Sequence, residues 1–558
     1  MIDSKKRLHA SRIKDKLIFL LQLVTLFLLS VFSACRCHPE ASLKADNTLH
    51  VIVSSSPESL DPRFATSAVA SHLSELIFAS LFVIGEDLLP ESFLAKDIEQ
   101  INPVTYLVHL RPNLFFHDGT PLTAEDVAYT FSSLKDPDVR SPHAEKFNYT
   151  QSVQAISEHT IQFVIKAPFA PFLTDLCSLG IVSKKHCQNR SQQCRHEIMG
   201  SGPYRLTQFD KVTDTLILQA QTQWFEAGPL LPRIEVRVVK DSTTRLLELI
   251  KGKADFNSGE TSPVQTSVVQ KYPEQLILKK TPGLGFAYLA MNLRGPKNTK
   301  AIKESEEDRT RRALTDVRVR KALALSIDIN AILKYKFHGM ATRATGLIPP
   351  QHWAKSQQLS PLLYDPITAR SLLDQAGFTD RGPGKGQRFK ITISTSPDRF
   401  RQSIALIYAQ NFRDLGIETQ LRIKDFSALY QDIKQGNFEI FSLIWTPVVE
   451  PDLFHWIFHS SNIPGPEKGG GNRGAYLDPI IDELIIQART STNLEIRKVL
   501  YEKIEMRLLE TLPYIPLWFE DEIVVMNRNV LHFTPSRTGS LLGLRHVKLM
   551  RTNSKGPL

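Results

Sequence analysis

The chain has 558 residues, of which 42% are hydrophobic and 23% are charged. This ordinary globular composition excludes disordered and collagen-like classes, and the length allows a core that is divided between two or three domains. The formal net charge is +10, but the basic residues are spread along the chain without a dense Lys/Arg block, so no nucleic-acid partner is expected.

The N-terminal segment has the pattern of an export signal. Basic residues precede Leu17, and the apolar stretch at 17–31 is shorter than the about 20 residues that a membrane-spanning helix needs. Small residues follow it, so the pattern predicts a secretory signal peptide over residues 1–34. The letters FSAC at 32–35 resemble the lipobox of bacterial lipoproteins, which makes Cys35 the predicted lipidation site. A plain signal peptide and an uncleaved signal anchor stay open as alternatives, and each of the three exports the bulk of the chain.

The remaining cysteines suit an exported protein. Cys187 and Cys194 bracket a polar loop that a disulfide could close in an oxidising compartment. Cys177 lies in the same region and could compete for either partner. The chain has no Cys-x-x-Cys pair, so a zinc-ribbon interpretation has no support, and no metal site is expected.

Hydrophobic spacing predicts mixed strands and helices along the whole chain, which is typical of an α/β protein. In chain order, the sequence predicts a strand at 49–56, a helix at 67–82, a strand at 105–112, a helix at 124–134, strand signals at 151–166, a turn entering a strand at 200–206, strands at 215–221 and 233–239, a helix and a short strand within 241–256, a strand at 286–293, helices at 317–333 and 364–378, a loop at 381–388, a strand at 389–395, a helix at 403–415, a strand, helix and strand within 417–445, a long helix at 480–509 and strand signals at 514–526.

One short stretch gathers acidic and imidazole side chains, which are the raw material of a metal site or an acid–base centre. It contains His117, Asp118, Glu125 and Asp126. However, Asp118 begins a turn with the glycine that follows it, and Thr123 with Asp126 has the spacing of a helix capping box. Glu125 and Asp126 also suit the positive end of the helix dipole. The acidic side chains therefore have structural roles, and we expect neither a metal site nor catalysis here.

Local motifs give no positive case for an enzyme or for a cofactor. The glycine-rich segment 382–386 precedes a predicted strand, whereas a dinucleotide-binding loop must follow one. The chain has no G-x-S-x-G nucleophile elbow and no H-E-x-x-H zinc motif. Spacing alone leaves open a triad assembled from distant residues, so a secreted hydrolase of peptides or cell-wall fragments stays as the alternative function.

The segment 107–134, "LVHLRPNLFFHDGTPLTAEDVAYTFSSL", resembles the signature of the family 5 bacterial extracellular solute-binding proteins. These are the oligopeptide-, dipeptide- and nickel-binding components of ABC importers. The resemblance extends over roughly residues 49–540. Further motifs that are similar to those of the family follow in order at 58–62 (ESLDP), 200–206 (GSGPYRL), 315–333, 364–378 and 512–519 (LPYIPLWF).

The resemblance implies a two-lobed periplasmic binding protein (type II) with mixed sheets, a hinge and an extra α/β subdomain on the first lobe. The implied domains are a signal peptide at 1–34, a lipidated tether at 35–48, the first lobe at 49–82, 200–290 and 510–558, its extra subdomain at 83–199, and the second lobe at 291–509.

The implied function is to capture oligopeptides or a related small solute between the lobes and to deliver them to an ABC permease and its ATPase subunits. The implied protein is a monomer without a cofactor, exported to the periplasm or cell surface and anchored to the membrane through lipid. A surface interaction protein that keeps this fold without transport is a further alternative.

The resemblance also implies ligand-binding residues. Trp445 matches the aromatic of the family's W-x-x-D element, whose aspartate pairs with the α-ammonium of a peptide. Val448 stands in the place of that aspartate, and Glu450 is the nearby acid. The pairing charge is therefore missing or moved, which leaves open a modified peptide, a different small solute or a shifted role for Glu450. The other implied ligand-binding residues are Thr66, Ser67, Ala68, Tyr288, Asn292, Thr446, Trp518 and Phe519.

Overall fold

The computed structural model describes residues 47–188, 194–259, 261, 263–297, 304–380, 387–445, 448–465 and 468–550. The predicted signal peptide and Cys35 lie outside these residues. Among the described residues, none of the helices has both the length and the apolar character that crossing a membrane requires.

The first sheet has seven strands in the order β12-β19-β11-β1-β10-β9-β8. At its centre, β1 runs parallel to both β10 and β11, and helices α2, α7 and α8 accompany the sheet. The strands are β1 (Thr48–Val53), β8 (Tyr204–Asp210), β9 (Thr215–Ala220), β10 (Arg233–Val238), β11 (Phe256–Asn257), β12 (Leu276–Thr281) and β19 (Glu522–Asn527), and the helices are α2 (Ala68–Ile77), α7 (Ser242–Ile250) and α8 (Pro263–Val269).

A separate antiparallel sheet has four strands in the order β4-β5-β7-β6, and helix α3 packs on β6 and β7. A cluster of phenylalanine side chains forms its core, with Phe163 at the centre of edge-to-face contacts to Phe131 and Phe172. The elements of this subdomain are β2 (Phe82–Ile84), β3 (Pro90–Ser92), β4 (Ala95–Asn102), β5 (Thr105–Leu110), α3 (Ala124–Ser133), β6 (Thr150–Ser157), β7 (Thr160–Ile165), α4 (Phe172–Leu176) and α5 (Lys184–Cys187).

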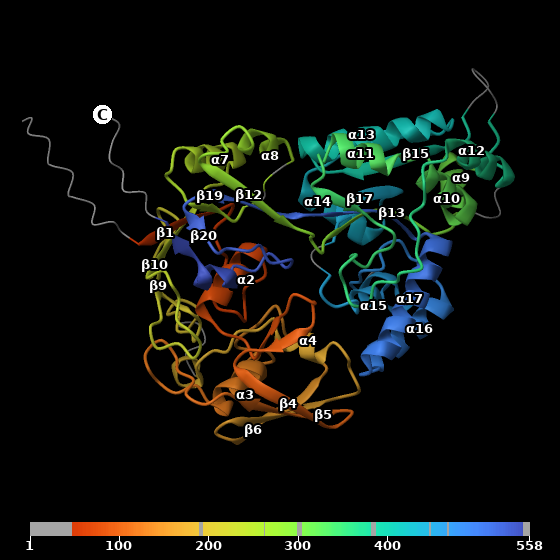
Figure 1. Ribbon diagram of the computed structural model, residues 1–558. Coiled ribbons are helices and arrows are strands. Elements are labelled where there is room, and N and C mark those ends of the chain that lie inside the picture. The colour runs from red at the N-terminus through yellow and green to blue at the C-terminus, as the bar shows by residue number, and fades with distance from the viewer. Residues whose placement is uncertain are drawn as a thin grey trace, which may run out of the picture. The chain divides into compact units, whose positions relative to one another are not determined.

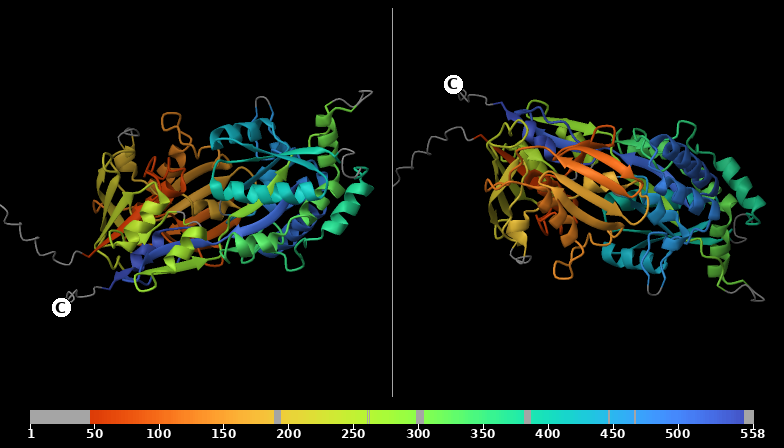
Figure 2. Two further views of the ribbon diagram at one scale, coloured as in Figure 1. Left: turned by 90° about the horizontal axis from the view of Figure 1, so that it is seen from above. Right: turned by 90° about the horizontal axis from the view of Figure 1, so that it is seen from below.

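The third sheet has six strands in the order β14-β18-β13-β17-β15-β16. Helix α13 packs on β15 and β16, as the view from above in Figure 2 shows. The strands are β13 (Phe286–Met291), β14 (Ala341–Arg343), β15 (Lys390–Thr395), β16 (Glu418–Ile423), β17 (Ile440–Ile444) and β18 (Tyr514–Glu520). The helices are α9 (Glu306–Thr315), α10 (Val317–Leu325), α11 (Ile329–Tyr335), α12 (Pro366–Gln375), α13 (Arg399–Asp414), α14 (Phe426–Gln435), α15 (Leu453–Phe458), η1 (Ser460–Asn462), α16 (Pro479–Thr490) and α17 (Leu494–Thr511).

Two chain connections join the seven-stranded and six-stranded sheets. The first links β12 to β13 and the second links β18 to β19, and β12 pairs with β19 while β13 pairs with β18. The connections run side by side (Figure 1). Lys280 lies 2.9 Å from Asp521 at this point, and a Cβ atom on Gly283 would come within 2.1 Å of the Glu520 carbonyl oxygen. A paired double crossing of this kind can act as a hinge.

Sheet pairing differs from the predicted domain boundaries at both connections. The boundaries at 290/291 and 509/510 place β13 and β18 with the first lobe, whereas both strands lie in the six-stranded sheet. After β19, the chain returns along the first lobe through β20 (Val530–Leu531), η2 (Leu542–His546) and β21 (Lys548–Leu549).

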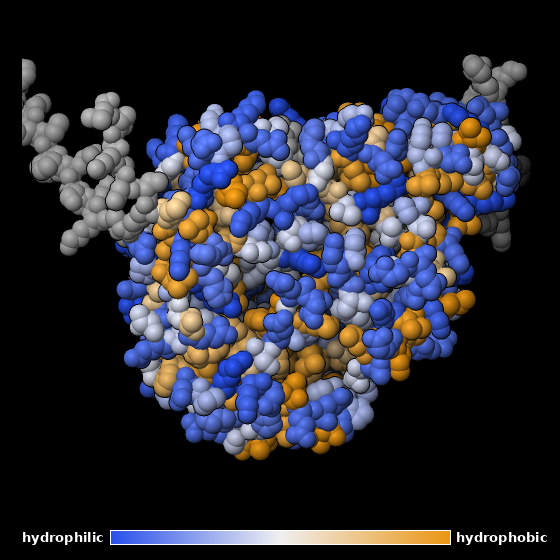
Figure 3. All heavy atoms as spheres, viewed as in Figure 1, coloured by the Kyte–Doolittle hydropathy of each residue, from blue (hydrophilic) through white to orange (hydrophobic). Residues whose placement is uncertain are grey.

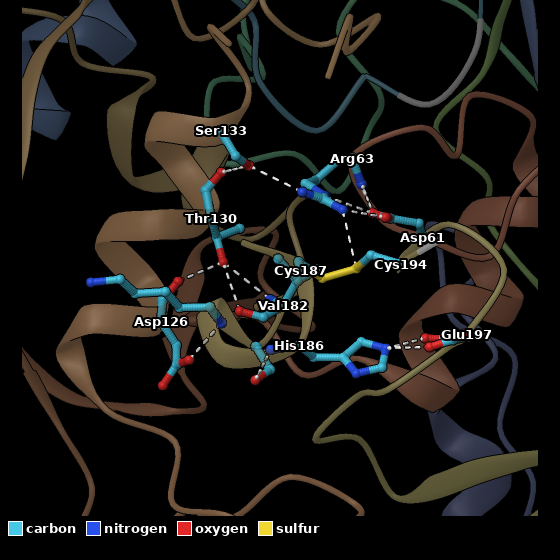
Figure 4. Close-up of a disulfide and its surroundings, with 12 residues drawn as sticks. Asp61, Arg63, Asp126, Thr130, Ser133, Val182, His186, Cys187, Cys194 and Glu197 are labelled. Atoms are coloured by element: carbon cyan, nitrogen blue, oxygen red, sulfur yellow. Dashed lines mark hydrogen bonds and ion pairs between the residues drawn. A yellow bond between two sulfur atoms is a disulfide. The ribbon is translucent and has the colours of Figure 1, made fainter. Parts of the chain in front are cut away.

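Cys187 and Cys194 form a disulfide, and Cys177 is a free cysteine. The Arg63 guanidinium reaches from a buried ion pair with Asp61 to within 3.4 Å of the Cys194 sulfur (Figure 4). The disulfide joins the end of α5 to Cys194, and the Arg63 contact connects it to the loop that follows β1.

Candidate functional site

A large cavity with a volume of ≈ 1150 Å³ lies between the subdomain, the first lobe and the second lobe. Its lining comes from four distant parts of the chain, within 75–93, 142–178, 448–489 and 534–546. The space-filling view in Figure 3 shows apolar residues inside the hollow between the regions of α4 and α15.

Aromatic and aliphatic side chains form much of the cavity wall. Phe78 follows α2 on the first-lobe side, Phe93 and Phe169 lie on the subdomain, and Leu453 and Trp456 lie on α15. Trp456 keeps 40% of its surface exposed, which is unusual for so large an apolar side chain. An exposed aromatic beside a hollow is suited to cover the apolar part of a ligand.

Three contacts join the subdomain to the second lobe at the edge of this cavity. The Thr174 hydroxyl donates to the Glu450 carboxylate at 3.3 Å, and the Ala170 N–H donates to the Arg489 carbonyl at 2.8 Å. The Arg489 guanidinium also lies 5.0 Å from the centre of the Phe169 ring. These contacts hold the two walls together, and separating the lobes would break all of them.

Glu450 lines the cavity but is already neutralised. Its carboxylate forms an ion pair with Arg497, and the two side chains are only 15% and 7% exposed. Burial raises the pKa of Glu450, while the Arg497 charge lowers it. A shifted role for Glu450 in amine recognition is one of the alternatives that the sequence leaves open. In that role, the ligand amine would have to compete with Arg497 and Thr174 for the Glu450 carboxylate.

Asp452 and Asp175 place two more carboxylates beside Glu450. Asp452 lies 3.5 Å from Arg489, and burial raises the pKa of Asp452 to about 7. Asp175 lies 3.1 Å from Lys146, and burial raises its pKa as well. The cavity edge is thus a network of acidic and basic side chains shared by both walls.

Trp445 and Val448 stand on either side of two residues that the structure does not describe. Val448 lines the cavity, is 1% exposed, and its N–H donates to the Leu284 carbonyl at 3.1 Å. Trp445 is half-buried and stacks on Tyr288 with ring centres 6.3 Å apart. The Arg473 guanidinium lies 5.5 Å from the centre of the Trp445 ring. The predicted site residue Thr446 lies outside the described residues.

Four of the predicted ligand-binding residues are buried in the six-stranded sheet and do not line the cavity. Tyr288 stacks against Tyr514 at 4.4 Å between ring centres. Asn292 donates to the carbonyls of Gly436 and Phe438, each at 2.9 Å. Trp518 and Phe519 pack in the core on opposite faces of β18. These four side chains therefore contact core residues or backbone carbonyls, and they do not face the cavity.

Thr66, Ser67 and Ala68 lie at the start of α2 and outside the lining of the large cavity. The backbone N–H groups of Thr66 and Ser67 donate to the Glu58 carboxylate at 2.5 and 2.7 Å. Burial alone would raise the pKa of Glu58, but the hydrogen bond from the Ser67 hydroxyl and those from the two N–H groups outweigh it and hold the pKa at about 2.

The acid-rich stretch at His117–Asp126 is structural, as predicted. The Thr123 N–H donates to Asp126 at 2.9 Å in the predicted capping box, and Glu125 pairs with Lys184 at 2.7 Å. The His117 ring contacts the Gly202 carbonyl at 3.0 Å. Across the described ranges, no group of three or more His, Cys, Asp and Glu side chains is arranged to hold a metal ion.

Comparisons with known proteins agree with this architecture. The family model of the bacterial extracellular solute-binding proteins, family 5 Middle, matches residues 90–465. The glutathione-binding protein GsiB of Shigella dysenteriae serotype 1 is 24% identical over 501 residues, which cover 87% of this chain and 91% of that protein.

Solved structures share the fold over nearly the whole of their chains. The ABC transporter substrate-binding protein CtaP of Listeria monocytogenes matches with a TM-score of 0.78 and 20% identity, over 90% of this chain and 99% of that one. The oligopeptide-binding protein AppA of Bacillus subtilis, solved with a nonapeptide, matches with a TM-score of 0.71 and 22% identity over the same shares.

Proposed function

Because the chain belongs to the family 5 bacterial extracellular solute-binding proteins, we propose that it captures an oligopeptide or a related small solute in the large cavity. The protein then delivers the captured solute to the permease of an ABC importer. The observation that carries this proposal is the cavity itself, whose walls come from both lobes and touch at their edge. Its volume of ≈ 1150 Å³ lies just above the range of about 300–1,000 Å³ that is usual for small-molecule pockets.

The arrangement suits a binding protein that closes on its ligand. A solute held between the walls stabilises the closed form by its differential affinity for that form. The paired crossing at Lys280 and Asp521 supplies the flexible connection. We further propose that the protein is exported, anchored to the membrane through lipid at Cys35, and monomeric. The proposed function includes no catalytic step.

Native mass spectrometry of the exported protein, followed by calorimetric titration with a peptide library, tests the proposal. We expect a co-purified solute and saturable peptide binding that weakens in the Trp456→Ala variant. Tyr335→Ala is the control, since Tyr335 is an exposed aromatic residue outside the cavity lining. The absence of both a co-purified solute and peptide affinity contradicts the proposal, and turnover of a bound peptide would favour the hydrolase alternative.

A further inference from the structure

The lining of the large cavity has a charge opposite to that of the chain. The chain carries an excess of basic residues, with 68 Lys and Arg against 58 Asp and Glu. The cavity lining contains seven acidic residues but only three Lys and Arg residues. Low-dielectric walls focus the field of such an excess into the cleft, where it raises the local concentration of oppositely charged solutes.

The three basic residues of the lining are already paired within the chain. Lys146 lies 3.1 Å from Asp175, and Arg489 lies 3.5 Å from Asp452. Arg545 lies 3.6 Å from Glu226. Each of these cations therefore has a protein carboxylate beside it, with which an anionic ligand would have to compete.

Several acidic residues of the lining lack such a balance. Within the part of the chain that the structure describes, Glu86, Glu91 and Glu145 form no ion pair. The half-buried Glu75 accepts a hydrogen bond from the Ser540 hydroxyl, but burial raises the pKa of Glu75, so it adds less negative charge than the exposed glutamates. Glu86 and Glu91 come from the β2–β3 hairpin of the subdomain, and Glu75 comes from α2 of the first lobe.

Histidines in the lining do not offset these carboxylates at neutral pH. Burial lowers the pKa of His455 to about 3 and also lowers the pKa of His546. These shifts favour the neutral form of both rings. The spare charge of the cavity is therefore negative.

We propose that the cavity selects solutes with a net positive charge, peptides that contain lysine or arginine in particular. This inference rests on the proposed binding function and names its substrate class. The unpaired carboxylates of Glu86, Glu91 and Glu145 on the subdomain supply the attraction. The apolar walls at Phe78 and Trp456 take up the remaining side chains.

Calorimetric titration of the full exported chain with three peptides of equal length tests the inference. The peptides are Ala-Ala-Lys-Ala-Ala, its all-alanine counterpart and its glutamate counterpart. We expect the dissociation constant of the lysine peptide to be about tenfold below that of the alanine peptide. This preference should shrink with salt, because the Debye length falls from about 30 Å at 0.01 M to about 3 Å at 1 M.

Variants connect the preference to the named carboxylates. In the double variant Glu86→Gln with Glu91→Gln, the lysine preference should fall to about threefold or less. Both side chains are exposed, so their substitution leaves the core intact. Glu274→Gln is the matched control, since Glu274 is an exposed acid outside the cavity lining and should keep the full preference.

The outcomes separate this inference from the proposed function. Equal affinities for the three peptides, or a preference for the glutamate peptide, overturn the charge selection and leave peptide binding in place. Failure of all three peptides to bind overturns the proposed function and the charge selection with it. A lysine preference that survives in the double variant assigns the selection elsewhere and overturns the role of Glu86 and Glu91.

Discussion

The Thr174 hydroxyl lies 3.3 Å from the Glu450 carboxylate, and this hydrogen bond joins the subdomain to the second lobe across the edge of the cavity. The two residues are 276 positions apart in the chain. Their contact exists only while the walls are together, so it measures closure directly.

Thr174→Val removes this hydrogen bond with little change in shape. Because the acceptor is charged, we expect peptide affinity to fall by about threefold to tenfold, mainly through faster dissociation. Stopped-flow fluorescence measures the dissociation rate. The control is Thr315→Val at an exposed helix end, which should leave it unchanged. An unchanged rate in Thr174→Val would show that the contact plays no part in holding the ligand.

Glu450→Gln tests whether this acid serves the fold or the ligand. The change leaves the buried Arg497 without its counter-charge, so we expect a loss of about 3 kcal/mol in the free energy of unfolding. Chemical denaturation measures this loss. The control is Glu495→Gln, at an exposed position of α17, the helix that carries Arg497. A loss below about 1 kcal/mol, combined with weaker peptide binding, would instead make Glu450 a ligand contact.

Asp452 should make stability depend on pH. Burial raises its folded-state pKa from 3.8 to about 7, so between these values the folded protein holds a proton that the unfolded chain releases. Stability therefore falls as pH rises through this window and levels off above it. In Asp452→Asn, the fall should shrink by on the order of 3 kcal/mol. Denaturation at a series of pH values measures this, with exposed Asp138→Asn as the control. Identical pH profiles for Asp452→Asn and the parent protein contradict the assignment.

The crossing between the sheets is sensitive to a single methyl group. A Cβ on Gly283 would lie 2.1 Å from the Glu520 carbonyl oxygen, a backbone atom of the neighbouring connection. We expect Gly283→Ala to destabilise the protein by about 2 kcal/mol or more, because the clash forces the two connections apart. Gly295→Ala meets no atom within 4 Å and serves as the control. Equal melting temperatures for the two variants would refute the close approach.

The disulfide between Cys187 and Cys194 should stabilise the protein although its loop is short. The bridged cysteines are seven positions apart, for which chain entropy gives about 2–3 kcal/mol. We expect this loss when both are changed to serine, measured by denaturation under non-reducing conditions. Cys177→Ser should have no such effect, because that cysteine is free. An equal loss in Cys177→Ser, or peptide mapping that pairs Cys177, would reverse the assignment.

Local patterns predicted the elements whose ends carry a clear signal. The strand β5, the turn at Asp118 and the capped helix α3 are all confirmed, because each depends on neighbours in the sequence. The predicted helix at 317–333 is instead two helices, since Asp328 caps the start of α11. The predicted helix at 480–509 likewise breaks where Asn493 caps α17.

Pairing between distant strands determines which sheet a strand joins, and local sequence patterns do not predict this. The apolar run at 514–526 divides between two sheets, with β18 in one and β19 in the other, because each half finds a different partner strand. The charged segment after residue 304 forms α9, which the sequence analysis did not predict. Its buried face is small, so its hydrophobic signal is weak.

The ligand-binding site was the part of the molecule that the sequence predicted least well. Of the candidate ligand-binding residues, the structure places Glu450 at the cavity, while aromatic candidates such as Trp518 are core residues. Phe169, Asp175 and Arg489 were missed because the cavity lining comes from segments hundreds of residues apart. Asp452 had a signal, since it follows Glu450 closely, but its position at the cavity depends on α15.

The most direct test of peptide capture is a crystal structure of the protein with Ala-Ala-Lys-Ala-Ala. We predict peptide density inside the large cavity, between Phe78 on the first-lobe side and the Thr174–Glu450 contact, with the lysine toward Glu86 and Glu91. An empty cavity at saturating peptide, or density only in a separate hollow lined by Glu58, Arg195 and Phe209, would contradict the account.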